Sequence, residues 1–208
     1  MITIIDYKMG NLGSILNMFK RIGVDAKVTG DPDQIAKADK LLLPGVGNFS
    51  QCATNVAEMN LAPVLRDSVI KRGVPMLGIC MGMQLLGKDS EEGPGQGLGF
   101  IDARSTKFRP TPDIHGKTAK VPHMGWSYVA GAKPHPLLAG LEIPRFYFVH
   151  SYWVACANRN DVLLESEYGG CRFNAGVARD NFAGVQFHPE KSHLFGTRLL
   201  TNFAAWRP

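Results

Sequence analysis

The stretch VPMLGICMGMQLLG, residues 74–87, decides the fold class, because an apolar run and a helical run meet in it at one cysteine. Residues 74–79 predict a buried β-strand, and residues 81–87 predict the helix that follows. Cys80 lies at the junction, with one glycine two residues before it and another two residues after it. This spacing is the cysteine version of the G-x-S-x-G nucleophile elbow, whose sharp turn leaves no room for larger side chains. The alternative is a buried structural cysteine at an ordinary strand–helix turn.

The same alternation of strand and helix runs through the N-terminal part of the chain. Strands are predicted at 2–6, 24–29 and 40–43, with helices after Asn11, after Asp31 and over 52–71. This order predicts a parallel, doubly wound α/β sheet. From residue 98 onward, short strand-like runs such as 145–155 predict β-hairpins added to that sheet, and 193–206 predict a closing helix. No domain boundary is visible, so residues 1–208 are expected to form a single domain.

Composition limits the functional classes. The 208 residues carry a net charge of +5 without a Lys/Arg run longer than two residues, which disfavours a nucleic-acid partner. No apolar run approaches the ~20 residues of a membrane span, and MITIID predicts a first strand, so we expect a cytoplasmic protein. The cysteines form no CxxC pair, so neither disulfides nor a metal site is expected, and Cys52, Cys156 and Cys171 are interpreted as small apolar residues. The glycines of 90–99 do not follow a strand, and no cofactor is expected.

A base for the cysteine is offered by the segment QFHPE, residues 186–190. An apolar stretch delivers His188 to a strand end, where Pro189 stops the strand. Glu190 can turn back to hold the imidazole by a hydrogen bond and so select its tautomer. A thiol, a base and an orienting group are the set that nucleophilic catalysis needs. The alternative is a surface turn in which His188 and Glu190 have no chemical role.

The two motifs GICMGMQ (78–84) and VQFHPEKS (185–192) together resemble the class I, or triad, glutamine amidotransferases. Further segments are similar to one branch of that family, the glutaminase subunits of imidazole glycerol phosphate synthases. They are LPGVGNF (43–49), SEEGPGQGLG (90–99), VPHMGWS (121–127), FYFVHSY (146–152) and EYGG (167–170). The resemblance covers nearly the whole chain. It implies a flavodoxin-like version of the predicted mostly parallel sheet with its added β-hairpins.

The resemblance implies that Cys80, His188 and Glu190 form the catalytic triad of a glutaminase. Cys80 would attack the carboxamide of glutamine, while His188 takes the thiol proton and later gives one to the departing ammonia. A glutamyl thioester would then be hydrolysed to glutamate. The N–H of Met81 is expected at the oxyanion, because the helix N-terminus directs its donors toward the reacting atoms.

Further positions carry over by the same resemblance. The residues expected to bind glutamine or its oxyanion are Gly45, Val46, Gly47, Met81, Gln84, Glu92, His150, Ser151 and Tyr152. Val46 lies between two glycines, so its peptide is free to flip and to switch the oxyanion hole. Gln84 as a plain cap or surface residue and Glu92 as a solvated loop charge are the alternatives.

A partner is implied as well, namely a cyclase subunit of (β/α)8 fold that receives the ammonia within a heterodimer. The residues that match the family's contact surface, or are added to it as candidates, are Asn11, His123, Met124, Trp126 and Lys191. An exposed tryptophan is a good interface anchor. The alternative for Trp126 is a place in the core.

Four positions depart from the usual pattern of the branch. Lys8, Gly13, Met81 and Ser127 stand where glycine, arginine, leucine and asparagine are common. Met81 stays apolar, and the others lie in segments expected to face the partner, so a paralogue that supplies ammonia for amidino-sugar synthesis in surface polysaccharide remains an alternative. Two alternatives from other classes are a cysteine peptidase-like hydrolase and a non-catalytic binding module on the same fold.

Overall fold

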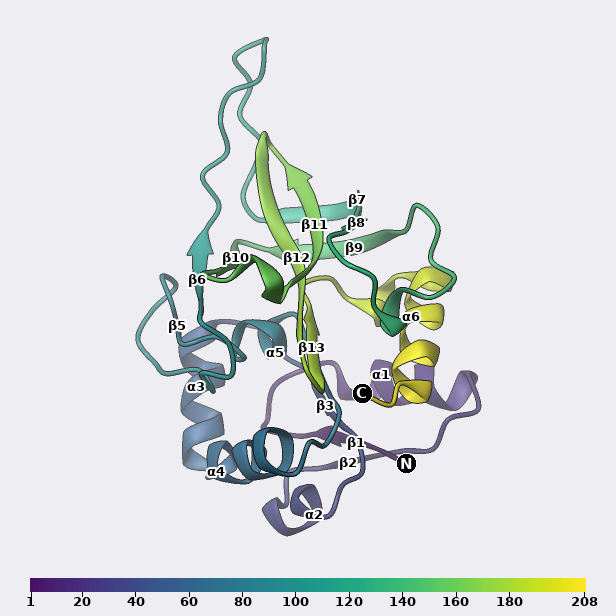
Figure 1. The fold of residues 1–208 in the computed structure, drawn as a ribbon. Coiled ribbons are helices and arrows are strands. Elements are labelled where there is room, and N and C mark those ends of the chain that lie inside the picture. Colours follow the sequence, from purple (N-terminus) through teal and green to yellow (C-terminus); the bar gives the residue numbers. More distant parts are fainter.

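The computed structural model describes residues 1–208, and an eight-stranded sheet runs through its centre (Figure 1). The chain up to Gln84 alternates strands and helices: β1 (Ile2–Ile5), α1 (Leu12–Arg21), β2 (Ala26–Thr29), α2 (Pro32–Ala36), β3 (Leu41–Leu43), α3 (Phe49–Glu58), α4 (Leu61–Leu65), β4 (Met76–Ile79) and α5 (Met81–Gln84). The rest is mainly extended: β5 (Asp89–Ser90), β6 (Ala103–Lys107), β7 (His123–Tyr128), β8 (Ala130–Gly131), β9 (Arg145–His150), β10 (Tyr152–Cys156), β11 (Val162–Tyr168), β12 (Cys171–Arg179) and β13 (Phe182–Val185), closed by α6 (His193–Ala205).

The central sheet has the strand order β2-β1-β3-β4-β13-β12-β11-β8. The neighbours from β2 to β13 are parallel, whereas those from β13 to β8 are antiparallel. The parallel part follows the 2-1-3-4-5 order of flavodoxin-like sheets, with β13 as the fifth strand. Two small sheets, β10-β6-β5 and β7-β9, are added beside it. The predicted doubly wound, mostly parallel sheet with added hairpins is therefore confirmed.

Two hydrophobic cores cover the two faces of the central sheet. Alternation along β3 sends Leu42 into one core, and Leu41 and Leu43 into the other. Helices α1 and α6 pack on the Leu42 face, with Phe19 and Phe203 among their buried residues. Helices α3, α4 and α5 pack on the opposite face. Both faces of the parallel strands are thus removed from water, as parallel sheets require.

The carboxyl ends of the parallel strands meet at one edge of the sheet. The loop 44–48 follows β3, Cys80 follows β4, and residues 186–188 follow β13. Strand β4 pairs with both β3 and β13, so these three segments are neighbours although they lie far apart in the sequence. In doubly wound sheets, ligands bind at this edge.

Three predicted elements differ from the observed ones. The helix predicted over 52–71 is interrupted at Asn60, whose φ of 51° is left-handed, and it divides into α3, α4 and a π-helical segment, Arg66–Lys71. The helix predicted over 81–87 ends at Gln84. Residues 145–155 divide into β9 and β10, which belong to different sheets. In each case the apolar pattern continues across a turn, so periodicity alone does not locate the break.

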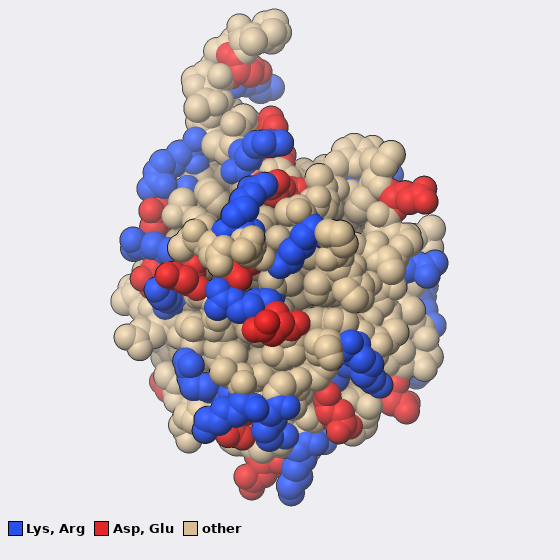
Figure 2. Space-filling view, in the orientation of Figure 1, with Lys and Arg blue, Asp and Glu red and all other residues tan.

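The surface carries one long projection and a mixed charge pattern. The segment between β6 and β7 extends away from the body of the molecule, and its turn is closed by a bridge between Pro112 and Thr118 (Figure 1). Figure 2 shows Lys and Arg side chains interspersed with Asp and Glu over the face in view. No helix combines the length and the apolar character that crossing a bilayer demands.

Candidate active site

Cys80 occupies a strained turn between β4 and α5. Its φ of 54° and ψ of −108° lie outside the regions that residues with side chains normally adopt, and its N–H donates to Val185 O at 2.8 Å. A Cβ on Gly82 would overlap the Leu43 carbonyl, and a Cβ on Gly78 would lie 2.6 Å from Gly82 O. Glycine is therefore required at both positions for β3, β4 and α5 to come together. Strain of this kind persists where the surrounding structure over-determines it, and it clusters at functional sites.

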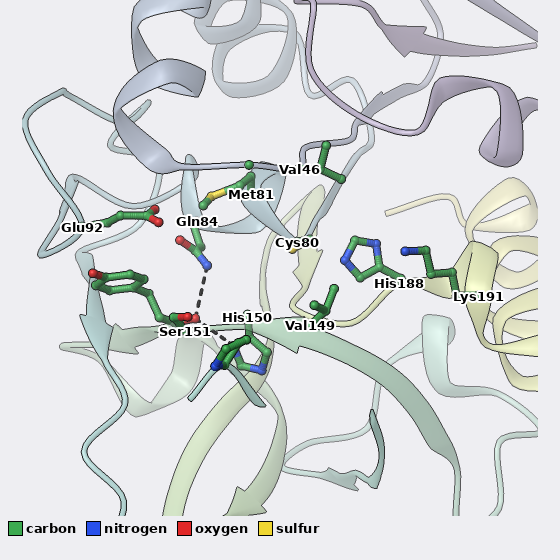
Figure 3. A pocket seen from close by; sticks show the side chains of 13 residues that line it. Val46, Cys80, Met81, Gln84, Glu92, Val149, His150, Ser151, His188 and Lys191 are labelled. Atoms are coloured by element: carbon green, nitrogen blue, oxygen red, sulfur yellow. Dashed lines mark hydrogen bonds between the residues drawn. The ribbon is translucent and has the colours of Figure 1, made fainter. Parts of the chain in front are cut away.

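His188 follows β13 and lines the same cavity as Cys80 (Figure 3). Its Nδ1 lies 2.8 Å from Glu190 Oε1, and both side chains are almost fully buried. The His188 N–H donates to Tyr147 O at 2.9 Å, and Ser192 Oγ donates to His188 O at 2.6 Å. These contacts fix the backbone and the ring, while the buried Nε2 has no hydrogen-bond partner.

The charge state of His188 follows from opposing influences. Burial disfavours the imidazolium, but the nearby Cys80 sulfur and the Glu190 carboxylate outweigh burial and raise the pKa of His188 to about 10. A carboxylate on Nδ1 keeps a proton on that atom, so Nε2 is the atom that exchanges a proton with the cavity. His188 is therefore set to hold a proton released by Cys80.

The cavity in front of Cys80 has a volume of about 330 Å³. Every predicted glutamine-binding residue except Gly45 lines it, together with Pro122, Val149 and Lys191. Gly45 belongs to the loop 44–48 but is buried, and a Cβ at this position would overlap the Tyr7 hydroxyl. In Figure 3, Gln84 and Glu92 lie on one side of Cys80, and His188 and Lys191 lie on the other. The cavity thus brings a thiol, an imidazole, an amide and a carboxylate around a space suited to a small ligand.

Gln84 and Glu92 are both held by hydrogen bonds. Gln84 Nε2 donates to Tyr152 O at 3.3 Å and to Gln186 Oε1 at 3.2 Å, which leaves the buried Gln84 Oε1 without a partner. Glu92 Oε2 accepts the Phe49 N–H at 2.7 Å, at the start of α3. Both side chains therefore present fixed acceptors beside the cavity.

The loop 44–48 forms a less firmly held wall. Val46 is 38% exposed, and Gly47 has a φ of 96°. The Val46 carbonyl accepts from Cys52 Sγ at 3.7 Å, and Cys52 Sγ accepts in turn from Tyr7 OH at 3.7 Å. Burial raises the pKa of Cys52 to about 11, so the donor is a neutral thiol. Because thiols are weak donors, rotation of the Val46–Gly47 peptide breaks only a weak contact.

A buried histidine pair lies beside the cavity. His150 Nδ1 is 2.8 Å from Tyr152 O, His150 Nε2 is 3.1 Å from His123 Nδ1, and His123 Nε2 is 2.9 Å from Ser127 Oγ. Burial lowers the pKa of His150 to about 3 and that of His123 to about 4, so both rings are neutral. A carbonyl only accepts, so His150 donates to Tyr152 O, His123 donates to His150, and Ser127 donates to His123.

Comparison with known proteins assigns the family. The model of the family described as glutamine amidotransferase class-I matches residues 3–205. The chain belongs to this family. The elbow, the histidine segment and the closing helix fall within the matched range, as does the N-terminal strand from Thr3 onward.

The amidotransferase chain is similar to proteins from an archaeon and a bacterium. It is 50% identical over 204 residues to "Imidazole glycerol phosphate synthase subunit HisH 2" of Methanococcus maripaludis, and the match covers 98% of each chain. It is 47% identical to the protein of that name in Pseudomonas aeruginosa, again over 204 residues and 98% of each chain. These similarities confirm the resemblance to imidazole glycerol phosphate synthase subunits.

Solved structures share the amidotransferase fold at low identity. PurLQS of Thermotoga maritima matches with a TM-score of 0.73 at 18% identity, over 98% of this chain and 97% of that one. The glutaminase domain of Trypanosoma brucei CTPS with bound acivicin matches with a TM-score of 0.61 at 15% identity, over 100% and 94% of the two chains. At such identities the likeness bears on the fold alone.

The residues predicted to contact a partner do not all lie on the surface of the amidotransferase. Met124 and Trp126 are 60% and 41% exposed on one face of β7, and Asn11 and Lys191 are exposed as well. His123 is only 1% exposed, because alternation along β7 turns it inward into the histidine pair. A direct contact between its side chain and a partner is therefore not available in this structure.

Two residues near the triad candidates were not singled out from the sequence. Gln186 lies next to Cys80, and Ser192 bridges the His188 carbonyl and the Tyr147 N–H, which it accepts at 3.0 Å. Gln186 stands two positions before His188, so the period of a strand places both on one face, and this signal is present in the sequence. No group of three or more His, Cys, Asp or Glu side chains is placed to hold a metal ion.

Proposed function

We propose that the chain is the glutaminase subunit of an imidazole glycerol phosphate synthase, acting as one domain in the cytoplasm. It hydrolyses glutamine to glutamate and passes the ammonia to a (β/α)8 cyclase partner. The observation that carries this proposal is the arrangement at the sheet edge, where Cys80 shares a cavity with His188 and where Glu190 holds His188 Nδ1 at 2.8 Å.

The chemistry runs through Cys80 and His188. Cys80 transfers its proton to His188 Nε2, and the sulfur attacks the side-chain carbonyl carbon of glutamine. The tetrahedral intermediate collapses as the C–N bond breaks, and His188 returns the proton to the departing ammonia. A water, deprotonated by His188, then attacks the thioester and releases glutamate and the thiol. Glu190 stabilises the imidazolium that forms in both halves of the reaction.

The lining residues account for the recognition of glutamine. The Glu92 carboxylate and the unpartnered Gln84 Oε1 are acceptors suited to the substrate ammonium. The backbone of 150–152 lines the cavity where the substrate's backbone groups would pair. The N–H groups of Met81 and of the loop 44–48 are the donors for the oxyanion, and rotation of a loop peptide would complete the hole.

The exposed tryptophan on β7 supports docking of a synthase partner. Trp126 stacks on His193 with ring centroids 5.5 Å apart and planes at 9°, and the Arg145 guanidinium lies 5.6 Å from its ring centroid. These contacts hold the tryptophan in place, which lowers the entropy cost of binding. Lys8, which stands where glycine is common, has a φ of 66°, a conformation that glycine adopts without strain.

The test is release of glutamate from glutamine. The purified chain is assayed alone, with the histidine-pathway cyclase and its nucleotide substrate, and with the cyclase of an amidino-sugar pathway. A low rate that rises only with the histidine-pathway cyclase, and that disappears in Cys80→Ala, is the expected result. Stimulation by the sugar-pathway cyclase alone would assign the paralogous function. Peptidase activity without glutaminase activity, or no activity with any partner, would refute the proposal.

A further inference from the structure

Gln186 is the first residue after β13 and is fully buried. Its backbone N–H donates to Ala175 O at 2.9 Å, which continues the pairing of β13 with β12. Its side-chain Nε2 lies 3.6 Å from Cys80 Sγ, within hydrogen-bond range for sulfur. The buried side-chain amide of Gln186 thus contacts the Cys80 sulfur, and Gln186 belongs to the same segment as His188.

The orientation of this amide follows from its neighbours. The Tyr152 carbonyl can only accept, so the Gln84 atom that faces it at 3.3 Å is the nitrogen. The same Gln84 nitrogen lies 3.2 Å from one end of the Gln186 amide, which must therefore be the oxygen. The nitrogen of Gln186 is then the atom that faces Cys80. Reversing the Gln186 amide alone would set two nitrogens against each other and an oxygen against the sulfur.

We propose that Gln186 is a positioning residue that donates its side-chain N–H to the Cys80 sulfur and stabilises it as the thiolate. Its orientation is transmitted from the Tyr152 carbonyl through Gln84. Hydrogen bonds to a charged acceptor are about twice as strong as neutral ones, and burial of the pair strengthens this one further. The assignment rests on the proposed role of Cys80 as the nucleophile.

The relay also links the nucleophile to the substrate site. Gln84 uses its nitrogen on Tyr152 and Gln186, so its oxygen remains free and, in Figure 3, lies on the side toward Glu92. A bound ammonium group on that oxygen would polarise the Gln84 amide and strengthen its donation to Gln186. Cys80 would thereby be most strongly supported when the cavity is filled.

The test compares the pH profiles of Cys80 alkylation by iodoacetamide in the wild type, Gln186→Met and Gln186→Glu. Peptide mapping by mass spectrometry separates Cys80 from the other thiols. Met keeps the length of the side chain without the donor, so at neutral pH alkylation is expected to slow about ten-fold, with the profile displaced upward by about one unit. Glu replaces the donor with an acceptor and is expected to displace the profile further. A residue that merely filled space would not produce this graded order.

The other groups around the sulfur stay the same in these variants. The titratable side chains that face Cys80 are His188, Tyr7 and Cys52, with Glu92 and Lys191 on the cavity wall. Asn181→Ser is the matched control, because Asn181 is an amide that bonds the Val69 and Val74 carbonyls at the opposite end of β4. It is expected to lower thermal stability without moving the alkylation profile.

Two outcomes separate this inference from the proposed function. If wild-type Cys80 reacts no faster than Cys156 and Cys80→Ala still hydrolyses glutamine, the proposed role of Cys80 as the nucleophile fails. If Cys80 is the nucleophile but Gln186→Met keeps the wild-type profile, only the assignment of Gln186 is overturned. Should either variant not fold, the side-chain amide NMR signal of Gln186 in the wild type serves instead. It is expected to move as Cys80 is alkylated, and a stationary signal would overturn the assignment.

Discussion

The cavity has two walls of opposite character. The sheet wall consists of Cys80 and His188 at the ends of β4 and β13, together with Gln186 and Glu190, which hold them from outside the cavity. Its side chains are buried and bonded to one another or to the backbone. The loop wall consists of Val46 and Gly47, which lie in the exposed loop that follows β3. The only side-chain donor to Val46 O is a thiol at 3.7 Å.

The two walls are suited to different roles: the sheet wall to the reaction itself, and the loop wall to its regulation. The sheet wall cannot move without breaking pairs between β3, β4 and β13, so the relative positions of the proposed nucleophile, Cys80, and its proposed base, His188, are preset. The loop wall can change a peptide orientation at little cost, because its Val46 carbonyl accepts only from a thiol. A site with one rigid and one movable wall can stay inactive until a partner rearranges the movable loop wall. The reacting groups of the sheet wall keep their relative positions throughout.

The largest effect is expected on the sheet wall, from Glu190→Gln. The amide cannot stabilise the imidazolium as the carboxylate does, so partner-stimulated glutaminase activity should fall about a thousand-fold. Steady-state release of glutamate measures it. Glu165→Gln is the control, because Glu165 makes only an exposed pair with Arg159 at 2.7 and 2.9 Å. Near-wild-type activity in Glu190→Gln would show that the sheet wall is not the catalytic wall.

The next effect contrasts Gly82, which packs β3 against α5 behind the sheet wall, with Gly47 of the loop wall. Gly82→Ala should cost about 3 kcal/mol of unfolding free energy, because its Cβ meets the rigid Leu43 carbonyl. Gly47→Ala should cost about 1 kcal/mol, because its φ of 96° is strained for alanine but the Met9 side chain that it meets can move. Urea unfolding measures both. Equal costs would contradict the contrast in rigidity between the two walls.

A smaller effect tests the proposed docking role of the exposed face of β7, outside both walls. Trp126→Ala should weaken binding of the cyclase partner by about 2 kcal/mol, roughly thirty-fold in Kd, because an exposed, pre-stacked tryptophan is a typical interface anchor. Titration calorimetry or fluorescence anisotropy measures it. Ile70→Ser removes a comparable exposed apolar side chain from the π-helical segment behind α4 and should leave Kd unchanged. Equal Kd values for the two variants would place the interface elsewhere.

A further effect concerns the pH dependence of stability and His150, which lines the cavity. The pKa of His150 is lowered from 6.5 to about 3, so between these values the unfolded chain binds a proton that the folded chain excludes. Stability therefore falls as the pH falls through this window, by about 1.4 kcal/mol per unit for this group. The slope of unfolding free energy against pH reports the number of protons taken up on unfolding, and His150→Gln should lower that number by about one in this window. Urea unfolding at several pH values measures the slope.

His188, in the same cavity, contributes to stability with the opposite dependence on pH. Its folded pKa is raised to about 10, so its contribution to stability is complete below pH 6.5 and is lost as the pH rises toward 10. His188→Gln should therefore flatten the alkaline side of the stability profile, while His150→Gln changes the acidic side. An unchanged alkaline slope would contradict the raised pKa of His188.

Local motifs carried most of the site prediction. The elbow at Cys80 and the pair His188–Glu190 are encoded within short segments, because glycine spacing and a strand-ending proline act over a few residues. Gln186 was missed because its partner, Cys80, lies 106 positions away in the sequence. The helix predicted over 52–71 was too long, because the left-handed Asn60 breaks it in the middle of an apolar pattern.

The sequence by itself determined the doubly wound sheet, the strained turn at Cys80 and the pairing of His188 with the Glu190 carboxylate. These depend on periodicity and on local sterics, which the order of residues specifies directly. Only the tertiary structure decided that His123 is buried while Trp126 is exposed, and that Gln84 and Gln186 connect a backbone carbonyl to the sulfur. Such features depend on which strands become neighbours and on the direction of each hydrogen bond, and these follow from contacts between segments far apart in the chain.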